Sequence, residues 1–223
     1  MSGRYFTTGA ILAAVMSGAC TGGAQTVRAP ITQAGAPGEA GRDLGAAEVA
    51  RMGAPLHVAA DARFMRDMII HHLQAVEMTA LVAERTTSAD LRLLAERIEA
   101  SQEDELRAMR RWLTERGEAL PDEHAHHAGH DGHGADAHAG MPGMLSAAGM
   151  EQLRSARGAE FDRLFLEGMI HHHEGALVMV EQLFAIDGAG QETEIFQFAS
   201  HVDSDQRMEI MRMRRMLAER SQR

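Results

Sequence analysis

Apolar and polar residues alternate with a helical period in two stretches of the chain, residues 64–78 and 165–179, and the two stretches resemble each other. In each stretch a phenylalanine, a methionine, a histidine, an alanine and a second methionine follow at steps of four, three, four and three residues. These steps place all five side chains on one face of an α-helix. The matching pairs, including two beside this face, are Phe64/Phe165, Met68/Met169, Ile69/Ile170, His71/His172, His72/His173, Ala75/Ala176 and Met78/Met179.

The periodicity extends beyond these stretches and predicts five helices. They are expected at residues 61–85, 89–116, 146–157, 159–186 and 192–219. Asp61, Thr87 or Ser88, and Ser146 are the candidate N-caps. Gly117 is expected to end the second helix.

The second and last long helices also match each other, so the chain contains two copies of one helical hairpin. The pairs include Ile98/Val202, Gln102/Gln206, Glu105/Glu209, Leu106/Ile210 and Met109/Met213. Each hairpin has one apolar side that must be covered, and two such hairpins can cover each other. We therefore expect an all-α protein, a four-helix bundle made of two duplicated hairpins, with the paired histidines in one interior.

Histidine is the residue type in this pattern that simple packing explains least well. A buried imidazole has two nitrogens that need partners, and His71 and His172 lie on the inward face. His72 and His173 are turned about 100° further round their helices, so we expect them beside this face, towards a neighbouring helix. His171 lies on the other side, towards solvent. Two interpretations remain: core histidines that hydrogen-bond internally, or metal ligands, which we favour.

Four polar residues on the following helices have two interpretations as well. Gln102, Glu105, Gln206 and Glu209 either orient the imidazoles from behind or are ordinary polar residues of a helix surface.

Composition excludes some functions and emphasises two residue types. The 223-residue chain has a formal net charge of −10, which argues against binding to nucleic acid. It contains 16 Met and 13 His, but one Cys, so thiolate ligation inside the folded domain is not expected. The length suits one domain, which we place at residues 59–220.

The first 58 residues are expected to serve export and tethering. Residues 1–20 resemble a signal peptide, with Arg4 before a short apolar segment. Two processing routes are open. In one, Cys20 is acylated as in a bacterial lipoprotein, which would be the chain's one membrane contact; in the other, ordinary cleavage occurs near residues 22–24. Residues 21–58 are rich in Gly, Ala, Pro and Thr and predict a flexible linker. Both routes place the protein in the periplasm or cell envelope.

The segment between the two hairpins, residues 122–145, differs from the rest in composition. Its low hydrophobicity predicts a flexible loop that does not pack as a core element. It contains two methionines near its end and the histidines His124, His126, His127, His130, His133 and His138. We expect this loop to collect metal ions with little selectivity; the alternative is a soluble linker that is rich in histidine.

The donor types of the repeated stretches favour a soft metal ion. Di-iron bundles place a glutamate three residues before the histidine, whereas this chain has Met68 and Met169 there. Imidazole and thioether groups suit copper, above all Cu(I), and also Ag(I), with Cu(II) as a further candidate.

The repeated pattern Phe-x-x-x-Met-Ile-x-His-His-x-x-Ala-x-x-Met, with Gln-x-x-Glu and Met on the following helix, resembles the domain of unknown function 305 family. The resemblance covers about residues 59–218. It implies an exported, ferritin-like helical bundle similar to the CopM-type periplasmic copper-binding proteins, with a role in copper homeostasis or resistance and other copper-handling proteins as partners. By that resemblance the candidate ligands are Met68, His71, His72, Met78, Met169, His172, His173 and Met179, with Met109 and Met213 as weaker candidates.

Two further function classes stay open. A ferritin-like oxidase acting on Cu(I) or Fe(II) is the alternative, although no nucleophile motif, phosphate loop or cofactor fingerprint is present. A structural envelope protein would use the histidine pairs only for mutual hydrogen bonds. The sequence favours a non-catalytic metal-binding protein and leaves its oligomeric state open, a dimer included.

Overall fold

The structure is a computed structural model that describes residues 31–33, 40–45, 56–122 and 140–220. The chain divides into two compact units, Met1–Gly53 and Ala54–Arg223. Its elements are β1 (Ile31–Gln33), β2 (Arg42–Leu44), α2 (Ala59–Ala80), α3 (Val82–Arg85), α4 (Ala89–Glu115), α6 (Ala147–Ser155), α7 (Gly158–Phe184) and α8 (Thr193–Arg220). No helix in these ranges is both long enough and apolar enough to cross a membrane.

The first unit contains a small antiparallel pair of strands that the sequence analysis did not predict. β1 pairs with β2 so that Thr32 lies opposite Asp43, and the Thr32 hydroxyl donates a hydrogen bond of 2.6 Å to the Asp43 carboxylate. Each strand has three residues, which is too short for an alternating pattern to be recognised. The expected signal peptide and Cys20 lie outside the described residues.

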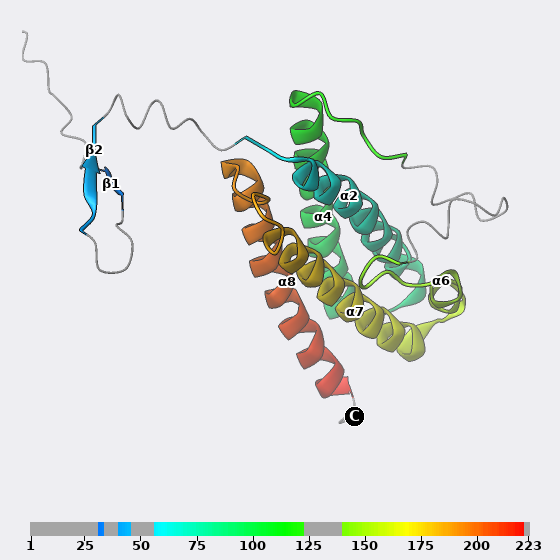
Figure 1. Cartoon of the computed structure of the whole chain (residues 1–223). Coiled ribbons are helices and arrows are strands. Elements are labelled where there is room, and N and C mark those ends of the chain that lie inside the picture. The colour runs from blue at the N-terminus through cyan, green and yellow to red at the C-terminus, as the bar shows by residue number, and fades with distance from the viewer. Residues whose placement is uncertain (1–30, 34–39, 46–55, 123–139, 221–223) are drawn as a thin grey trace, which may run out of the picture. The chain divides into compact units, whose positions relative to one another are not determined.

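The second unit is the expected helical bundle of two hairpins. α4 packs against α2, α8 packs against α7, and α2 and α7 pack against each other. Figure 1 shows α2 and α7 side by side, with the short helix α6 next to α7. The helix expected at 61–85 is interrupted at Leu81, which separates α2 from α3. The other long helices begin and end within two residues of their expected limits. The hydroxyls of Ser88 and Ser146 accept the capping hydrogen bonds from Leu91 and Gly149. The bundle is therefore all-α, as predicted.

One cap prediction was wrong. Val58 is the N-cap residue of α2, and Asp61 lies inside the first turn. The Asp61 carboxylate nevertheless accepts a hydrogen bond of 2.9 Å from the backbone N–H of Val58. Its other oxygen accepts one of 2.7 Å from Gly190 in the turn between α7 and α8. Asp61 is fully buried and therefore joins the start of one hairpin to the turn of the other.

The core consists of two apolar clusters at opposite ends of the bundle. The first contains residues from the beginning of α2, the end of α4, the end of α7 and the beginning of α8. The second contains residues from the opposite halves of these helices, together with Met150 and Leu153 of α6. Each long helix therefore passes from one cluster to the other, and a short segment in its middle belongs to neither.

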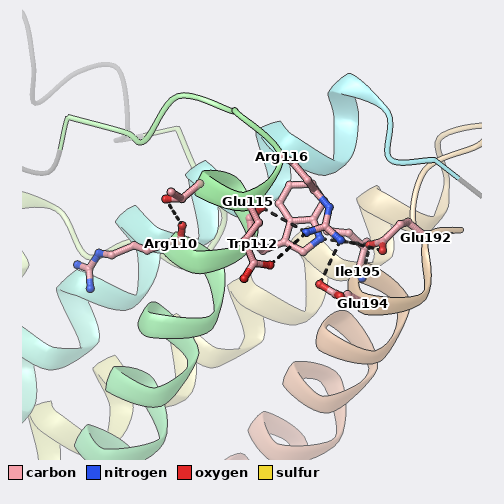
Figure 2. Close-up of polar contacts among 8 residues, drawn as sticks. Arg110, Trp112, Glu115, Arg116, Glu192, Glu194 and Ile195 are labelled. Carbon is pink, nitrogen blue, oxygen red and sulfur yellow. Dashed lines mark hydrogen bonds and ion pairs between the residues drawn. The ribbon is translucent and has the colours of Figure 1, made fainter.

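A polar contact network closes the end of the bundle where α4 meets α8 (Figure 2). The guanidinium of Arg116 lies 4.4 Å above the Trp112 ring and binds the Glu192 carboxylate at 2.9 Å. The Trp112 indole N–H donates to the other oxygen of Glu192 at 3.2 Å. This carboxylate also accepts a hydrogen bond of 3.1 Å from the backbone N–H of Ile195, in the first turn of α8. The network thereby fixes the two hairpins to each other.

Candidate metal centre

A layer of polar side chains lies between the two apolar clusters. On every long helix, the segment that belongs to neither cluster carries two of these residues. We call this set the polar layer; its members are His71 and His72 on α2, Gln102 and Glu105 on α4, His172 and His173 on α7, and Gln206 and Glu209 on α8. The four histidines are fully buried and the two glutamines are 1% exposed. The repeated motif is thus brought into one interior, as the sequence predicted.

His72 and His173 each face a glutamate on the next helix of their own hairpin. The Nε2 atom of His72 lies 2.5 Å from the Glu105 carboxylate, and that of His173 lies 2.6 Å from the Glu209 carboxylate. A carboxylate can only accept, so Nε2 carries the proton and donates in both cases. This places both rings in the same tautomer. The glutamates orient the imidazoles, and the alternative that they are ordinary surface residues is wrong.

His71 and His172 meet where α2 and α7 pack together. Their ring centroids are 3.8 Å apart and the rings are tilted by 34°. Nε2 of His71 donates to the Pro142 carbonyl at 3.1 Å, and Nε2 of His172 donates to the His71 carbonyl at 2.9 Å. Burial, with the neighbouring histidines, lowers the pKa of His71 to about 3 and that of His172 well below its usual 6.5. Both imidazoles are therefore neutral at physiological pH.

The second ring nitrogen gives the layer its chemical character. In all four histidines Nδ1 is buried and has no hydrogen-bond partner among the residues that the structure describes. In a neutral ring with the proton on Nε2, Nδ1 presents a lone pair to the interior, and a lone pair on neutral imidazole is what a metal ion binds. A carboxylate that accepts from the opposite nitrogen is the usual arrangement behind a metal-bound histidine. The polar layer therefore fits a metal ion, and with neutral nitrogen donors it fits a soft or borderline one.

The candidate methionines border the polar layer instead of lying within it. Met68, Met109 and Met179 belong to the first apolar cluster, and Met78, Met169 and Met213 belong to the second. All are fully buried except Met179, which is 6% exposed. Met68 precedes His72 by one turn of α2, and Met109 follows Glu105 by one turn of α4; Met169 and Met213 hold the same positions relative to His173 and Glu209. Each His–Glu pair thus has two thioethers one helical turn away.

The described residues hold no group of three or more His, Cys, Asp or Glu side chains arranged to bind one metal ion. A site in this layer would therefore combine histidine with other donors, for which the bordering thioethers are available. His171 is exposed, as expected. The loop histidines His124, His126, His127, His130, His133 and His138 lie outside the described residues.

Residues 141–145, which we call the strap, differ from the prediction of a loop that does not pack. Met141, Pro142, Gly143 and Met144 form a tight turn, closed by a 3.4 Å hydrogen bond from the Met144 N–H to the Met141 carbonyl. Gly143 has a φ of +77°, which with proline before it is the pattern of a type II turn. The Pro-Gly pair between two methionines was the sequence signal for this turn.

The strap packs on the two central helices. The Gln74 side chain accepts from the Leu145 N–H at 2.7 Å and donates to the Leu145 carbonyl at 3.0 Å. Gly175 of α7 makes the close approach possible, because a Cβ there would lie 2.2 Å from the Pro142 carbonyl oxygen. The strap thus covers His71 and supplies the acceptor that holds its ring.

Comparison with known proteins identifies the family. The family pattern described as "Domain of unknown function (DUF305)" matches residues 61–217. The chain belongs to the DUF305 family. No curated protein matches the chain.

Solved structures of two DUF305 proteins and of CopM share the fold. A DUF305 fragment from Deinococcus radiodurans is 28% identical with a TM-score of 0.63, covering 74% of this chain and 99% of that one. A DUF305 protein from Streptomyces coelicolor, predicted to be secreted, is 31% identical with a TM-score of 0.59, covering 73% and 92%. CopM in its Cu(II)-bound form is 25% identical with a TM-score of 0.56, covering 71% and 96%. CopM has also been solved with Cu(I) and with silver bound, at 21% and 22% identity.

Proposed function

We propose that this DUF305 protein is an exported, non-catalytic protein that binds copper, with Cu(I) favoured, through the polar layer and its bordering methionines, and that it contributes to copper homeostasis or resistance. The observation that carries the proposal is the set of four buried Nδ1 atoms without partners, in His71, His72, His172 and His173. A buried polar atom without a partner costs roughly 1–3 kcal/mol, and a metal ion would satisfy each lone pair that it binds.

The histidines would supply σ-donor nitrogens and the thioethers would supply soft sulfur donors. A neutral set of this kind leaves little uncompensated charge when a monovalent ion enters a dry interior. Glu105 and Glu209 would raise the basicity of His72 and His173 through the short Nε2 hydrogen bonds. The similarity to CopM, which binds copper and silver, supports the same class of ion.

The proposed location of the protein is the periplasm or cell envelope. The signal-like residues 1–20 and the similarity to a Streptomyces protein predicted to be secreted support export to the periplasm or cell envelope. There the protein would hold copper or pass it to other copper-handling proteins.

The test is an anaerobic Cu(I) titration of the mature chain against a competing chelator. Three variants separate the possible sites: deletion of residues 123–139, the quadruple change His71→Ala/His72→Ala/His172→Ala/His173→Ala, and His171→Ala. His171 is the matched control because it lies in the same triple-histidine run but is exposed. Far-UV circular dichroism and gel filtration check that each variant keeps its fold.

We expect tight binding to survive the loop deletion and the His171→Ala change and to be lost in the quadruple variant. Cu(I) should also raise the melting temperature, because an ion that binds only the folded state stabilises it. Binding that disappears with the loop would assign the metal to residues 123–139 and contradict a site in the bundle. Binding unchanged in both main variants would refute the proposal.

A further inference from the structure

Gln102 and Gln206 are buried in the polar layer at equivalent positions of α4 and α8. Each is 1% exposed, so the alternative that they are polar residues of a helix surface is wrong. Gln102 lies between Ile98, in the second apolar cluster, and Leu106, in the first. Gln206 lies between Val202, in the first cluster, and Ile210, in the second. Both amides therefore occupy the same level of the bundle as the histidines.

These amides lack the hydrogen bonds that a buried glutamine needs. In the described part of the chain, Oε1 of Gln102 has no hydrogen-bond partner, and neither Oε1 nor Nε2 of Gln206 has one. Within the described residues, eight buried side-chain nitrogen and oxygen atoms are without a partner, and seven of them lie in the polar layer. The absent partners are thus concentrated at one place in the fold. Leucine would fill a similar volume at these positions without the desolvation cost.

Packing does not explain the glutamines, and orientation of histidine does not either. Nε2 of His72 and of His173 is already held by a glutamate one helical turn away from each glutamine. Nε2 of His71 and of His172 is held by backbone carbonyls. No N–H of these rings remains for an amide oxygen to accept. The amide oxygens therefore find no donor among these rings, and a species that enters the layer would supply their partner.

The chemistry of an amide indicates what that species is. Cu(I) is satisfied by nitrogen and sulfur donors, whereas the harder Cu(II) also takes oxygen donors and water and prefers more ligands. The polar layer offers imidazole nitrogens from four histidines, thioethers at its borders, and amide oxygens from the two glutamines.

We propose that Gln102 and Gln206 determine the oxidation-state range of the site: their amide groups serve the coordination shell of Cu(II), as oxygen donors to the ion or as hydrogen-bond partners of its bound water. Cu(I), held by nitrogen and sulfur, does not need them. This inference rests on the proposed copper function and adds to it a role for residues that the histidine motif does not contain.

The test compares both oxidation states in the full mature chain carrying Gln102→Leu and Gln206→Leu together. Dissociation constants for Cu(I) and Cu(II) are measured by chelator competition, and the melting temperature of the metal-free protein is measured alongside. We expect Cu(II) affinity to fall about 10- to 100-fold, the range for outer-shell partners of a metal site, and Cu(I) affinity to stay within about threefold of the parent. Each tenfold loss of Cu(II) affinity, at unchanged Cu(I) affinity, should raise the reduction potential of bound copper by about 59 mV.

The metal-free protein gives an independent result. Removing unpaired buried amides should leave its melting temperature unchanged or higher. Gln197→Leu is the control on the surface of α8, because Gln197 is exposed. If the leucine variant lacks a cooperative unfolding transition, Gln102→Asn with Gln206→Asn keeps the amide but withdraws it by one methylene, and the same selective loss of Cu(II) is expected.

The outcomes separate this inference from the proposed function. Equal losses for both ions, or no loss for either, would overturn the role of the glutamines while leaving copper binding intact. A parent protein that binds neither ion would refute the copper function, and this inference with it. A lower melting temperature of the metal-free leucine variant would show that the amides have partners within the fold, which also contradicts the inference.

Discussion

The two hairpins carry the same polar residues but hold their central histidines differently. His72–Glu105 in α2–α4 and His173–Glu209 in α7–α8 are equivalent pairs, at 2.5 and 2.6 Å. The equivalence ends at the bundle centre. Nε2 of His172 donates to the backbone of the opposite hairpin, whereas Nε2 of His71 donates to Pro142 of the strap. Duplication therefore explains the candidate ligands, and the segment inserted between the copies explains the asymmetry.

Positions 74 and 175 show how the strap packs against the two duplicated helices. They are equivalent in the two copies, and one carries glutamine where the other carries glycine. Gln74 binds both backbone groups of Leu145, and Gly175 leaves room for Pro142. The strap thus depends on the two positions for opposite reasons, a hydrogen-bonding side chain at one and the absence of a side chain at the other.

Acid should have the largest effect on stability, because each of the two hairpins contributes a buried central histidine, His71 or His172. Burial lowers the pKa of His71 to about 3 and that of His172 well below 6.5. Below pH 6.5 the unfolded chain therefore binds protons that the folded bundle does not, so stability falls as the pH drops from 6.5 towards 3. The loss is roughly 1 kcal/mol per pH unit for each histidine. Urea denaturation of the metal-free domain at pH 7, 5.5 and 4 measures it.

The contribution of each hairpin follows from single variants. His71→Leu and His172→Leu should each reduce the slope of stability against pH, and His171→Ala should leave it unchanged, because His171 is exposed. A stability that does not depend on pH between 6.5 and 4 would contradict neutral burial of the central pair.

A smaller loss of stability is expected from Gly175→Ala, which changes the contact of one hairpin with the strap. In Gly175→Ala the new Cβ would lie 2.2 Å from the Pro142 carbonyl oxygen and 2.4 Å from Cα of Gly143. Backbone cannot yield as a flexible side chain can, so the strap must move away from His71. Overpacking of this kind costs about 1–3 kcal/mol, against a gain of about 1 kcal/mol in helix propensity. Thermal unfolding should show a net loss in the free energy of unfolding of up to about 2 kcal/mol.

Gly168→Ala is the matched control on the same helix. Its Cβ would meet Leu145 Cδ2 at 3.1 Å and Met78 Cε at 3.3 Å, which are ends of flexible side chains. We expect this variant to be as stable as the parent or slightly more so. Equal destabilisation by both substitutions would show that the strap is not held by its close approach to Gly175.

The sequence was sufficient for the repeated parts of the molecule and insufficient for the strap. Met68, His71 and Met78 share one stripe because helical geometry fixes which residues lie on one face, and repetition indicated that two such stripes meet. The strap could not be predicted in this way, because its position depends on tertiary contacts of Pro142 and Leu145. Its composition resembled the preceding loop, and the Pro-Gly pair at residues 142–143 indicated a turn but not the helices on which the turn packs.

The glutamines illustrate a second limit of the sequence. Gln102 and Gln206 each lie four residues from an apolar position on either side, so helical spacing places both on the apolar stripe. Their polar side chains left a position on the helix surface open as the alternative. Their burial is decided by which helix faces which, and their missing partners become visible only when the surrounding atoms are known. Buried polar groups without partners therefore add to what the histidine motif indicates about the site.

The smallest effect should come from changes that keep both histidines in place. In Glu105→Gln and Glu209→Gln the new amide oxygen still accepts from Nε2, but the negative charge that makes the imidazole a stronger donor is lost. We expect each variant to weaken Cu(I) binding by about tenfold, by the same factor in the two hairpins if the equivalence of the pairs extends to their chemistry. Glu174→Gln is the control, since Glu174 neighbours His173 on α7 but pairs with Arg214 at the surface.

Unequal effects of Glu105→Gln and Glu209→Gln would be informative, because the strap lies on the side of His71. A greater loss in α2–α4 would mean that the strap makes that hairpin the preferred holder of the ion. The double variant then tests whether the hairpins share one ion. Independent sites would each lose tenfold as in the single variants, whereas one shared ion would lose about a hundredfold, because two weakened donors act on the same bound metal. Chelator competition that measures both the Cu(I) dissociation constant and the number of Cu(I) ions bound per chain distinguishes two independent sites from one shared site.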